Sequence, residues 1–388
     1  MHLLDNALKA CHGNAFIYKF ISANDVGTTG SHQSGLYMPV DSWLLFFDTA
    51  CSRGENRDRH IQITWNDEIT TESRFIWYGA GTRREYRLTR FGRSFPYLGD
   101  DDVGALFILA KTEEDEYLAY ILDADEDIER FLAEFELSSL DLAGVVSSEK
   151  QKKSLQPSLT VEQLFAQFFN SLTVEFPTTI EMSLAAQNIC SQVYGSSSSS
   201  PDLFLLKWLE TEYDLFKFIE GRRYSNIICE PFENIEQLLE FANTILNRRK
   251  SRAGKSLENH LASMFRYHNI PFSQGEKTEG NKRPDFIFPN IDMYHEPSFP
   301  DGSLIFLGAK TTCKDRWRQI LNEADRIELK HLFTLQHGIS RNQLTEMEEA
   351  GVQLVVPEPY RGYFPDVFRE RIINLKQFIN LVQSKTGS

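Results

Sequence analysis

The chain has 388 residues, more than one ordinary hydrophobic core accommodates, so two domains are expected. A hydrophobic content of 41% with 29 phenylalanines excludes wholesale disorder. No apolar stretch is long enough to span a bilayer, and the first residues do not resemble a secretory signal. The five scattered cysteines form no CxxC pair that would indicate zinc or redox chemistry, so a reduced, cytoplasmic setting is expected.

The net charge of −14 argues at first against a nucleic-acid partner, but the charge is unevenly distributed. Residues 100–136 hold 14 acidic side chains against two basic ones, and the rest of the chain holds 41 against 39. Because charges far apart are screened, a basic groove can exist elsewhere on the surface. A solvated face is the preferred interpretation of the acidic segment, and a surface that mimics or repels DNA is the alternative.

Residues 14–110 read as mostly β, since alternating or β-branched stretches are separated by Gly, Asn and Asp turns. A helix is expected over residues 125–135. The polar segment 147–160 is expected to be an interdomain linker. The strand-like stretches include residues 16–21, 42–47 and 61–64.

The second half predicts alternating helices and strands. Thr160 and Gln163 have the spacing of a helix-opening capping box, and the serine run at 196–200 reads as an internal loop. Helices and strands that follow one another in this way predict a central sheet flanked by helices. Helices are expected at residues 256–267, 315–326 and 340–350, and strands at 284–288, 304–309, 331–335 and 352–356.

Three side chains on this framework suit phosphodiester hydrolysis. Asp285 begins one strand, Lys310 lies near the end of the next, and Glu323 follows on the expected helix. Carboxylates hold Mg²⁺, and a lysine can orient or deprotonate the attacking water. The arrangement resembles the PD-(D/E)xK nuclease motif, except that Gly308 stands where the second acid usually does. Glu258, on the preceding helix, could supply a further carboxylate.

The surrounding residues resemble the catalytic domain of the EcoRII-type restriction endonucleases. In that family the second acid is moved onto the helix, so Gly308 with Glu323 fits the family pattern. The resemblance implies Asp285, Lys310, Glu323 and Glu258 as catalytic residues, with Asp285 and Glu323 binding Mg²⁺. It rests on residues 249–258, 278–286, 310–325, 331–336 and 351–357.

The resemblance also implies roles for neighbouring residues. Lys314, Asp315 and Arg316 match the base-reading segment, and such side chains can read guanine and cytosine edges. Solvated helix charges are the alternative interpretation. In the densest basic cluster, phosphate contact and a solvated loop are equally acceptable. The residues of that cluster assigned to phosphate are Arg249, Arg252 and Lys255.

Tyr294 and His295 follow the first strand of the motif in a turn that matches the family. A position near the scissile phosphate and an ordinary surface turn are both compatible with this placement.

The N-terminal segments 22–37 and 87–93 resemble the EcoRII effector-binding domain, which looks like the plant B3 DNA-binding barrel. A Gly- and Thr-rich loop beside an arginine-rich strand could grip a DNA groove. The alternatives are a barrel whose arginines only solubilise it, and for His32 an ordinary turn position. The residues expected to bind effector DNA are His32, Tyr37, Arg83, Arg84, Arg87 and Arg90.

These observations predict an α+β protein of two domains. Residues 1–146 are expected to form a B3-like β-barrel that binds effector DNA. Residues 147–160 are the linker, and residues 161–388 are expected to form a restriction-endonuclease-like α/β/α layer with a central mixed sheet. Because two active sites are needed to cut both strands of a palindrome, a homodimer is expected.

The resemblance implies a Type II site-specific deoxyribonuclease of a prokaryotic cytoplasm, paired with a cognate DNA cytosine methyltransferase. Its target would be a short palindromic CC–GG site, with CCWGG favoured, although the residues leave the central base open. The family further implies that the N-terminal domain covers the catalytic cleft until effector DNA binds. Deletion of residues 1–160 is then expected to release cleavage of single-site DNA.

Two other functions remain possible from the sequence. A non-catalytic B3-like DNA-binding regulator would require a decayed nuclease, against which the intact Asp285, Lys310 and Glu323 speak. A repair or junction-resolving nuclease could use the same fold, because fold does not fix function. The base-reading segment beside the active site favours the sequence-specific enzyme.

Overall fold

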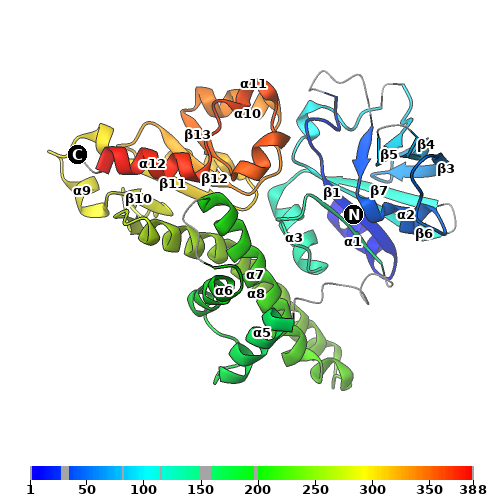
Figure 1. Ribbon diagram of the computed structural model, residues 1–388, viewed down its shortest axis with the longest axis horizontal. Coiled ribbons are helices and arrows are strands. Elements are labelled where there is room, and N and C mark those ends of the chain that lie inside the picture. The colour runs from blue at the N-terminus through cyan, green and yellow to red at the C-terminus, as the bar shows by residue number, and fades with distance from the viewer. Residues whose placement is uncertain are drawn as a thin grey trace.

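The computed structural model describes residues 2–27, 35–80, 83–93, 95–113, 116–147, 159–195 and 200–386. The molecule is a two-domain α+β protein, with an N-terminal barrel-like sheet and a C-terminal region of helices and a mixed sheet (Figure 1). Most of the expected linker 147–160 and of the serine run 196–200 lies outside the described residues. Within the described ranges, no helix is long and apolar enough to cross a membrane.

The N-terminal sheet is 8-stranded and nearly closed, in the order β2-β5-β4-β3-β7-β6-β1-β8. Neighbouring strands are antiparallel except β3 and β7, which run parallel. The strands are β1 (Ala15–Phe20), β2 (Leu36–Met38), β3 (Asn56–Trp65), β4 (Ile69–Tyr78), β5 (Glu85–Thr89), β6 (Leu106–Glu113), β7 (Glu116–Leu122) and β8 (Ala143–Val146).

Alternation along the strands builds the core of this domain. On β3, Ile61, Ile63 and Trp65 point inward and are buried, while the residues between them face outward or the rim. Strand β6 is buried on both faces, because α1 (Leu3–Cys11) and α3 (Asp125–Glu134) cover its outer side. The strand expected at residues 42–47 is wrong: residues 43–46 form the short helix α2 (Trp43–Phe46), whose Leu45 and Phe46 enter the barrel core.

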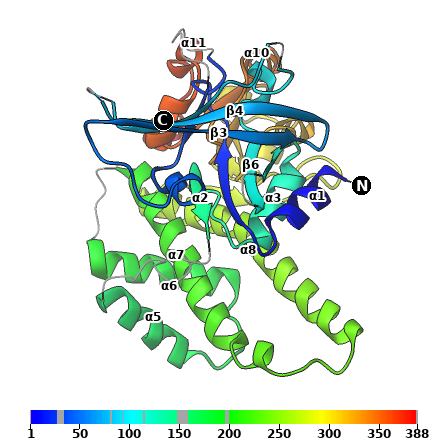
Figure 2. The same ribbon diagram turned by 90° about the vertical axis from the view of Figure 1, so that its right-hand side faces the viewer.

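A helical arm joins the two sheets and extends below them in Figures 1 and 2. Its own small core contains Phe165, Ile189 and Phe216. Thr178 and Glu181 form a reciprocal capping box at the start of α6, which was not expected from the sequence, while the helix expected to open at Thr160 begins at Leu159. The arm comprises α5 (Leu159–Ser171), α6 (Thr179–Tyr194), α7 (Pro201–Tyr224) and α8 (Ile235–Tyr267).

The C-terminal sheet is 5-stranded, in the order β13-β12-β11-β10-β9. The inner strand β11 (Ile305–Lys310) pairs antiparallel with β10 (Phe286–Phe288) and parallel with β12 (Lys330–Thr334), which pairs parallel with β13 (Val352–Val355). The edge strand is β9 (Ser273–Gln274). Phe265 of α8 packs on Phe286 and Phe378, which places α8 and α12 (Leu375–Thr386) against one face of the sheet.

The remaining helices are short. They are α9 (Ile291–His295), α10 (Arg341–Glu349) and α11 (Asp366–Arg369). The expected helix 340–350 is confirmed as α10, whose cap residue Ser340 accepts a hydrogen bond from the backbone N–H of Gln343 at 3.2 Å.

Two boundaries of the expected helices are wrong. The helix expected to begin at residue 256 begins at Ile235, because the polar segment before it continues the same helix α8. The helix expected over residues 315–326 is the 3-10 helix η5 (Arg316–Asn322), which ends one residue before Glu323.

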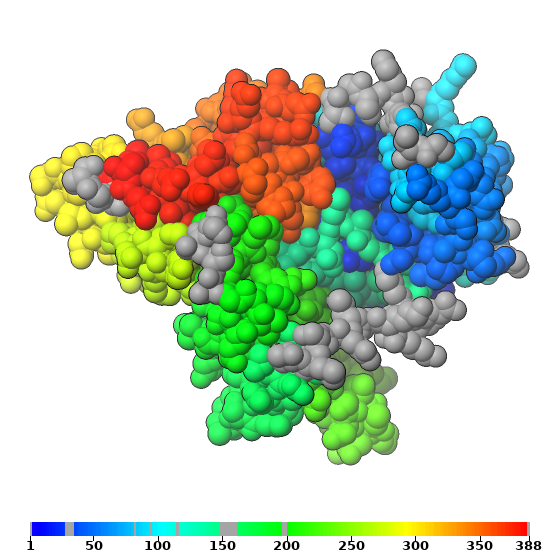
Figure 3. Space-filling model, viewed as in Figure 1, coloured from blue at the N-terminus to red at the C-terminus, as the bar shows by residue number. Residues whose placement is uncertain are grey.

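The two domains are in direct contact (Figure 3). Gly104 lies so close to the C-terminal domain that a Cβ atom there would be 2.5 Å from the carbonyl oxygen of Gly338. Its own carbonyl accepts a hydrogen bond from the buried Gln336 side chain at 2.8 Å. His337 is buried, stacks on Phe20, and its ring Nε2 lies 3.0 Å from the carbonyl oxygen of Ser139.

Candidate active site and its interdomain cover

Strand pairing brings Asp285 and Lys310 together. Asp285 immediately precedes β10, and the antiparallel register that pairs Phe286 with Leu307 sets it beside the end of β11. Its carboxylate accepts a hydrogen bond from the backbone N–H of Ala309 at 2.8 Å. The Lys310 ammonium lies 3.5 Å from the same oxygen. The structure therefore brings together two of the three residues on which the motif depends.

Gly308 explains why the second acid stands elsewhere. A Cβ atom at Gly308 would be 2.9 Å from the side chain of Ile320 in η5. Real Cβ atoms rarely approach so closely, so no acidic side chain fits there without displacing η5. Because Gly308 has no side chain, η5 can pack on β11. Glu323, the residue directly after η5, then lies toward the end of that strand.

Glu323 is in extended conformation directly after η5, and not on a helix as expected. Its pKa is raised to about 7, first by burial and then by the negative charge of Asp285, while Lys310 and Lys330 oppose the rise. Two carboxylates in a partly buried site repel each other unless a cation or a proton lies between them. Since it follows the end of η5, Glu323 does not share a helix with Arg316.

The donors at this site suit a hard divalent cation. Carboxylate oxygens of Asp285 and Glu323 are the ligand type that Mg²⁺ prefers, with water completing its coordination. No cluster of three or more His, Cys, Asp or Glu side chains arranged for a metal occurs among the described residues. The residues fit a site of two protein carboxylates, which is the pattern Mg²⁺ commonly uses beside a phosphate.

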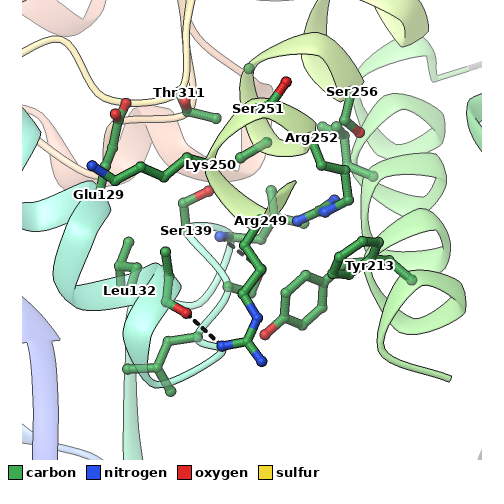
Figure 4. A pocket seen from close by; sticks show the side chains of 18 of the residues that line it. Glu129, Leu132, Ser139, Tyr213, Arg249, Lys250, Ser251, Arg252, Ser256 and Thr311 are labelled. Carbon is green, nitrogen blue, oxygen red and sulfur yellow. Dashed lines mark hydrogen bonds between the residues drawn. The ribbon is translucent and has the colours of Figure 1, made fainter. Parts of the chain in front are cut away.

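Glu258 lies on α8 at the wall of an interdomain cavity of about 390 Å³ (Figure 4). Its carboxylate is 2.7 Å from the Lys255 ammonium. Thr311 and Thr312, which follow Lys310, line the same cavity. The structure thus sets Glu258 near the strand that carries Lys310, in an ion pair with Lys255.

The expected base-reading residues are covered by α3 of the N-terminal domain. Asp125 accepts hydrogen bonds from the backbone N–H groups of Lys314, Asp315 and Arg316 at 3.1, 2.9 and 3.1 Å. Asp123 contacts the Lys314 ammonium, and Glu129 lies 2.7 Å from the Arg316 guanidinium. Carboxylates of the same chain therefore occupy the segment that was expected to read bases.

The titration of these groups reflects their burial. Burial raises the pKa of Asp125 to about 6, with the Asp315 side chain contributing, and the backbone N–H groups of Asp315 and Arg316 oppose that rise. Burial lowers the pKa of Lys314 to about 8. The preferred interpretation of the acidic segment as a solvated face is wrong for Asp125, which is fully buried. The signal that could have identified this cover was the clustering of acidic residues itself.

The basic cluster lies inside helix α8, so its interpretation as a solvated loop is wrong. Arg249 lies 2.8 Å from Glu220, contacts Glu136, and donates to the carbonyl of Ala133 at 2.9 Å. Arg252 is packed between the rings of Tyr213 and Phe216. Figure 4 shows Arg249 and Arg252 beside Tyr213 at the cavity. In this conformation both arginines have protein partners.

Tyr294 is not in a surface turn, since it is 1% exposed. Its hydroxyl contacts Glu279 and accepts a hydrogen bond from the backbone N–H of Arg326 at 3.2 Å. His295 is on the surface, and its ring is 2.9 Å from the carbonyl oxygen of Lys277. Tyr294 thus holds the chain just after Glu323.

The expected effector residues gather on β2, β5 and the segment before β5. Tyr37 on β2 pairs directly with Arg87 on β5, and the guanidinium lies 6.0 Å from the ring centre. Arg83 and Arg84 are exposed, and Arg90 is 3.1 Å from the ring of His60. His32 lies outside the described residues. His60 extends this face and was not expected from the sequence.

Known proteins resemble the chain along nearly all of its length. Residues 10–145 match the family described as "Restriction endonuclease EcoRII, N-terminal", and residues 216–379 match "EcoRII C terminal". The Type II restriction enzyme EcoRII of Escherichia coli is 36% identical over 393 residues, which cover 95% of this chain and 94% of that protein. The Type II restriction enzyme SsoII of Shigella sonnei is 28% identical over 127 residues, 30% of this chain and 40% of that protein.

Two solved structures are distant neighbours. Metal-depleted Ecl18kI in complex with uncleaved, modified DNA has a TM-score of 0.46 at 17% identity and covers 58% of this chain and 84% of its own. The PspGI–substrate DNA complex has a TM-score of 0.45 at 14% identity and covers 55% of this chain and 94% of its own. The relationship to the full-length E. coli enzyme, with both halves matched in order, shows that the chain belongs to the EcoRII family of Type II restriction endonucleases.

Proposed function

We propose that this chain cuts both strands of double-stranded DNA at a short palindromic CC–GG site, with CCWGG favoured, in a Mg²⁺-dependent reaction. The observation that carries the proposal is the contact between Asp285 and Lys310, whose charged atoms lie 3.5 Å apart. Glu323 belongs to the same site, because the charge of Asp285 contributes to its raised pKa. The pair of carboxylates would hold Mg²⁺, which would supply charge neutralisation at the phosphate and an activated water.

The side chains have separable roles in this proposal. Asp285 is fixed by the backbone N–H of Ala309, so one of its oxygens has a constant position relative to β11. The Lys310 ammonium orients the attacking water at its Nζ and screens the two carboxylates from each other. Glu323 releases its proton when a cation binds. Glu258, now paired with Lys255, would enter the site when DNA draws Lys255 toward a phosphate.

Specificity would come from Lys314, Asp315 and Arg316. Arg and Lys donate to guanine O6 and N7, and Asp accepts from cytosine N4, which is the chemistry that a CC–GG site requires. The segment follows the active-site lysine directly in sequence, so base reading and cutting would share one rigid part of the chain. Arg249, Arg252 and Lys255 would contact phosphates, provided that they leave their present partners.

The N-terminal domain would keep the enzyme inactive until effector DNA binds. Asp123, Asp125 and Glu129 occupy the ammonium, the backbone N–H groups and the guanidinium that would face DNA. A duplex and α3 cannot use the same donors at once. Effector DNA that separates the domains would therefore free the base-reading segment, as the family resemblance implies.

The effector site would be the outer face of the barrel. We assign the barrel itself to the B3-like type. Tyr37 and Arg87 form its centre, since they are adjacent on paired strands. Arg83, Arg84 and Arg90 would add positive charge around them, and His32 would complete the site. Attraction to phosphate needs no base reading, so this face can combine a weak general affinity with specific contacts.

A homodimer would place two active sites on the two strands. The first turns of α8 support this assembly, because they expose apolar side chains that no other described part of the chain covers. Leu238 and Leu239 are 45% and 56% exposed, and Ile235 is 70% exposed. Exposed apolar clusters of this kind mark protein–protein contacts. We assign residues 1–146 to the effector domain and 161–388 to the catalytic domain, and expect the gene to accompany one for a cytosine methyltransferase.

The test is cleavage of a two-site plasmid by the wild type and by Lys310→Ala, in Mg²⁺ and in EDTA. Discrete Mg²⁺-dependent fragments that Lys310→Ala does not produce are expected, and their mapped ends give the target. Lys385→Ala, at the exposed C-terminal end of α12, is the matched control and should cut normally. Tight specific binding without cutting would instead identify a DNA-binding regulator and retire the active site.

A further inference from the structure

The turn that follows Glu323 is in a conformation that its sequence disfavours. Ala324 is fully buried and has a φ of 52°, in the left-handed region. That region costs a residue with a Cβ atom about 1 kcal/mol or more. Such a conformation persists only where the surrounding structure determines it strongly. Contacts from outside the turn must therefore hold the backbone that presents Glu323.

Lys330 supplies the strongest of these contacts. Its side chain is buried at 4% exposure, and its ammonium donates to the carbonyl oxygens of Ala324 and Ile327 at 2.6 and 2.5 Å. The backbone N–H of Ile327 donates to the same Ala324 carbonyl at 3.0 Å. Lys330 is the first residue of β12 and pairs with Phe306 of β11. The ammonium therefore ties the turn to β12, the strand beside the one that carries Lys310.

Burying an ammonium without a carboxylate partner is costly, and the fold gives no packing reason for it. Removing such a charge from water costs several kcal/mol, which hydrogen bonds to carbonyls offset only in part. An apolar side chain of similar length would fill the same space beside Phe306. A lysine at this position is explained if its two carbonyl contacts fix the turn that presents Glu323.

Other contacts hold the same turn from the opposite side. Glu279 accepts a hydrogen bond from the backbone N–H of Asp325 at 3.2 Å. Lys282 lies 2.8 Å from the Asp325 carboxylate, in a pair whose side chains are 35% and 55% exposed. Exposed pairs of this kind contribute little to stability. Lys282 is thus a matched control for Lys330: a lysine that contacts the same turn from another segment, without the buried carbonyl contacts.

We infer that Lys330 is a positioning residue for Glu323, which sets the affinity of the site for its divalent cation without touching cation or DNA. The inference rests on the proposed role of Glu323 as a metal ligand. Residues that orient metal ligands typically change metal affinity or activity by about 10- to 100-fold when they are removed.

The experiment compares wild type, Lys330→Met and Lys282→Met as full-length proteins on two-site DNA. Calorimetry would measure Ca²⁺ binding to the protein–DNA complex, and cleavage would give the Mg²⁺ concentration for half-maximal rate. Lys330→Met is expected to weaken Ca²⁺ binding and raise that Mg²⁺ concentration by roughly tenfold. DNA affinity in EDTA should stay at the wild-type value, and Lys282→Met should match the wild type throughout.

A double-mutant cycle separates positioning from general destabilisation. In a Glu323→Gln background, Lys330→Met should have no further effect on Ca²⁺ affinity, because the ligand that it positions is already lost. An equal effect in both backgrounds, or an unchanged Ca²⁺ affinity, would overturn the inference. If Lys330→Met does not fold, Lys330→Gln, whose amide keeps N–H donors, takes its place in the same cycle. Its effect on Ca²⁺ affinity should again disappear in the Glu323→Gln background. A wild type that neither binds Ca²⁺ nor cuts would refute the proposed function instead.

Discussion

The carboxylate of Asp125 accepts a hydrogen bond from the backbone N–H of Asp315 at 2.9 Å, across 190 positions of the chain. Together with the N–H groups of Lys314 and Arg316, this contact closes α3 over the segment expected to read DNA. One buried carboxylate with three backbone donors thus connects the N-terminal domain to the C-terminal domain.

Asp125→Ala should release the enzyme from its own cover. The three backbone N–H groups would be left without an acceptor in the closed state, at a cost of about 1–3 kcal/mol, whereas water satisfies them in the open state. Cleavage of single-site DNA is expected to rise by about tenfold or more, since 1.4 kcal/mol corresponds to a factor of ten. Glu126→Ala, which removes an exposed carboxylate of the same helix, is the control. Equal rates of single-site cleavage for Asp125→Ala and Glu126→Ala would contradict the proposal that Asp125 holds α3 over the base-reading segment.

Arg87→Ala should abolish activation by a second DNA site while sparing the catalytic domain. Loss of one base or phosphate contact weakens effector binding by about 1–3 kcal/mol. In the Asp125→Ala background the same change should have little effect, because the cover is already released. Rates on one-site and two-site plasmids check both expectations, with the exposed Arg130→Ala as control. A loss of activity in the Asp125→Ala background would instead assign Arg87 to folding or catalysis.

Gly308→Asp, which restores the usual order of the PD-(D/E)xK motif, should impair the enzyme. Its Cβ atom would be 2.9 Å from Ile320, so η5 must move and carry Glu323 away. Overpacking of this kind costs about 1–3 kcal/mol, measurable by urea unfolding. Gly302→Asp is the matched control, because a Cβ atom there meets nothing within 4 Å. Restored cutting by Gly308→Asp in a Glu323→Gln background would show that the strand position can hold the acid.

His337 should make the closed molecule sensitive to acid. Burial lowers its pKa to about 4, against roughly 6.5 in an unfolded chain. Between these values the unfolded state binds a proton that the folded state excludes, so stability is complete above pH 6.5 and falls as the pH drops toward 4. The loss would reach about 3 kcal/mol at the lower limit. Buried His331, with a pKa also near 4, should add a similar slope.

His337→Gln, which keeps a donor and does not titrate, should therefore reduce the pH dependence of unfolding between pH 4 and 6.5. The free energy of unfolding from urea titrations at several pH values tests this. A variant with the full wild-type slope would assign the acid sensitivity to other groups, His331 first among them.

The sequence by itself determined the order of the elements and the identity of the motif residues. Strands β10 to β13 and helix α10 follow from hydrophobic runs and a local cap, which act over a few residues. Asp285, Lys310 and Glu323 could be named because their spacing and neighbours resemble a family. Local patterns placed α3 correctly for the same reason.

Only the tertiary structure decided how these parts act together. The extended conformation of Glu323 follows η5, which packs Ile320 over Gly308 of β11 in a segment whose periodicity predicts an ordinary helix. The role of Lys330 depends on the left-handed turn at Ala324, which brings the carbonyls of Ala324 and Ile327 within reach of its ammonium. Asp125 and Glu129 of α3 read as solvated until their partners, nearly half the chain away, are in place. Long-range contacts carry no local signal, because their energy depends on which segments meet and not on the composition of either one.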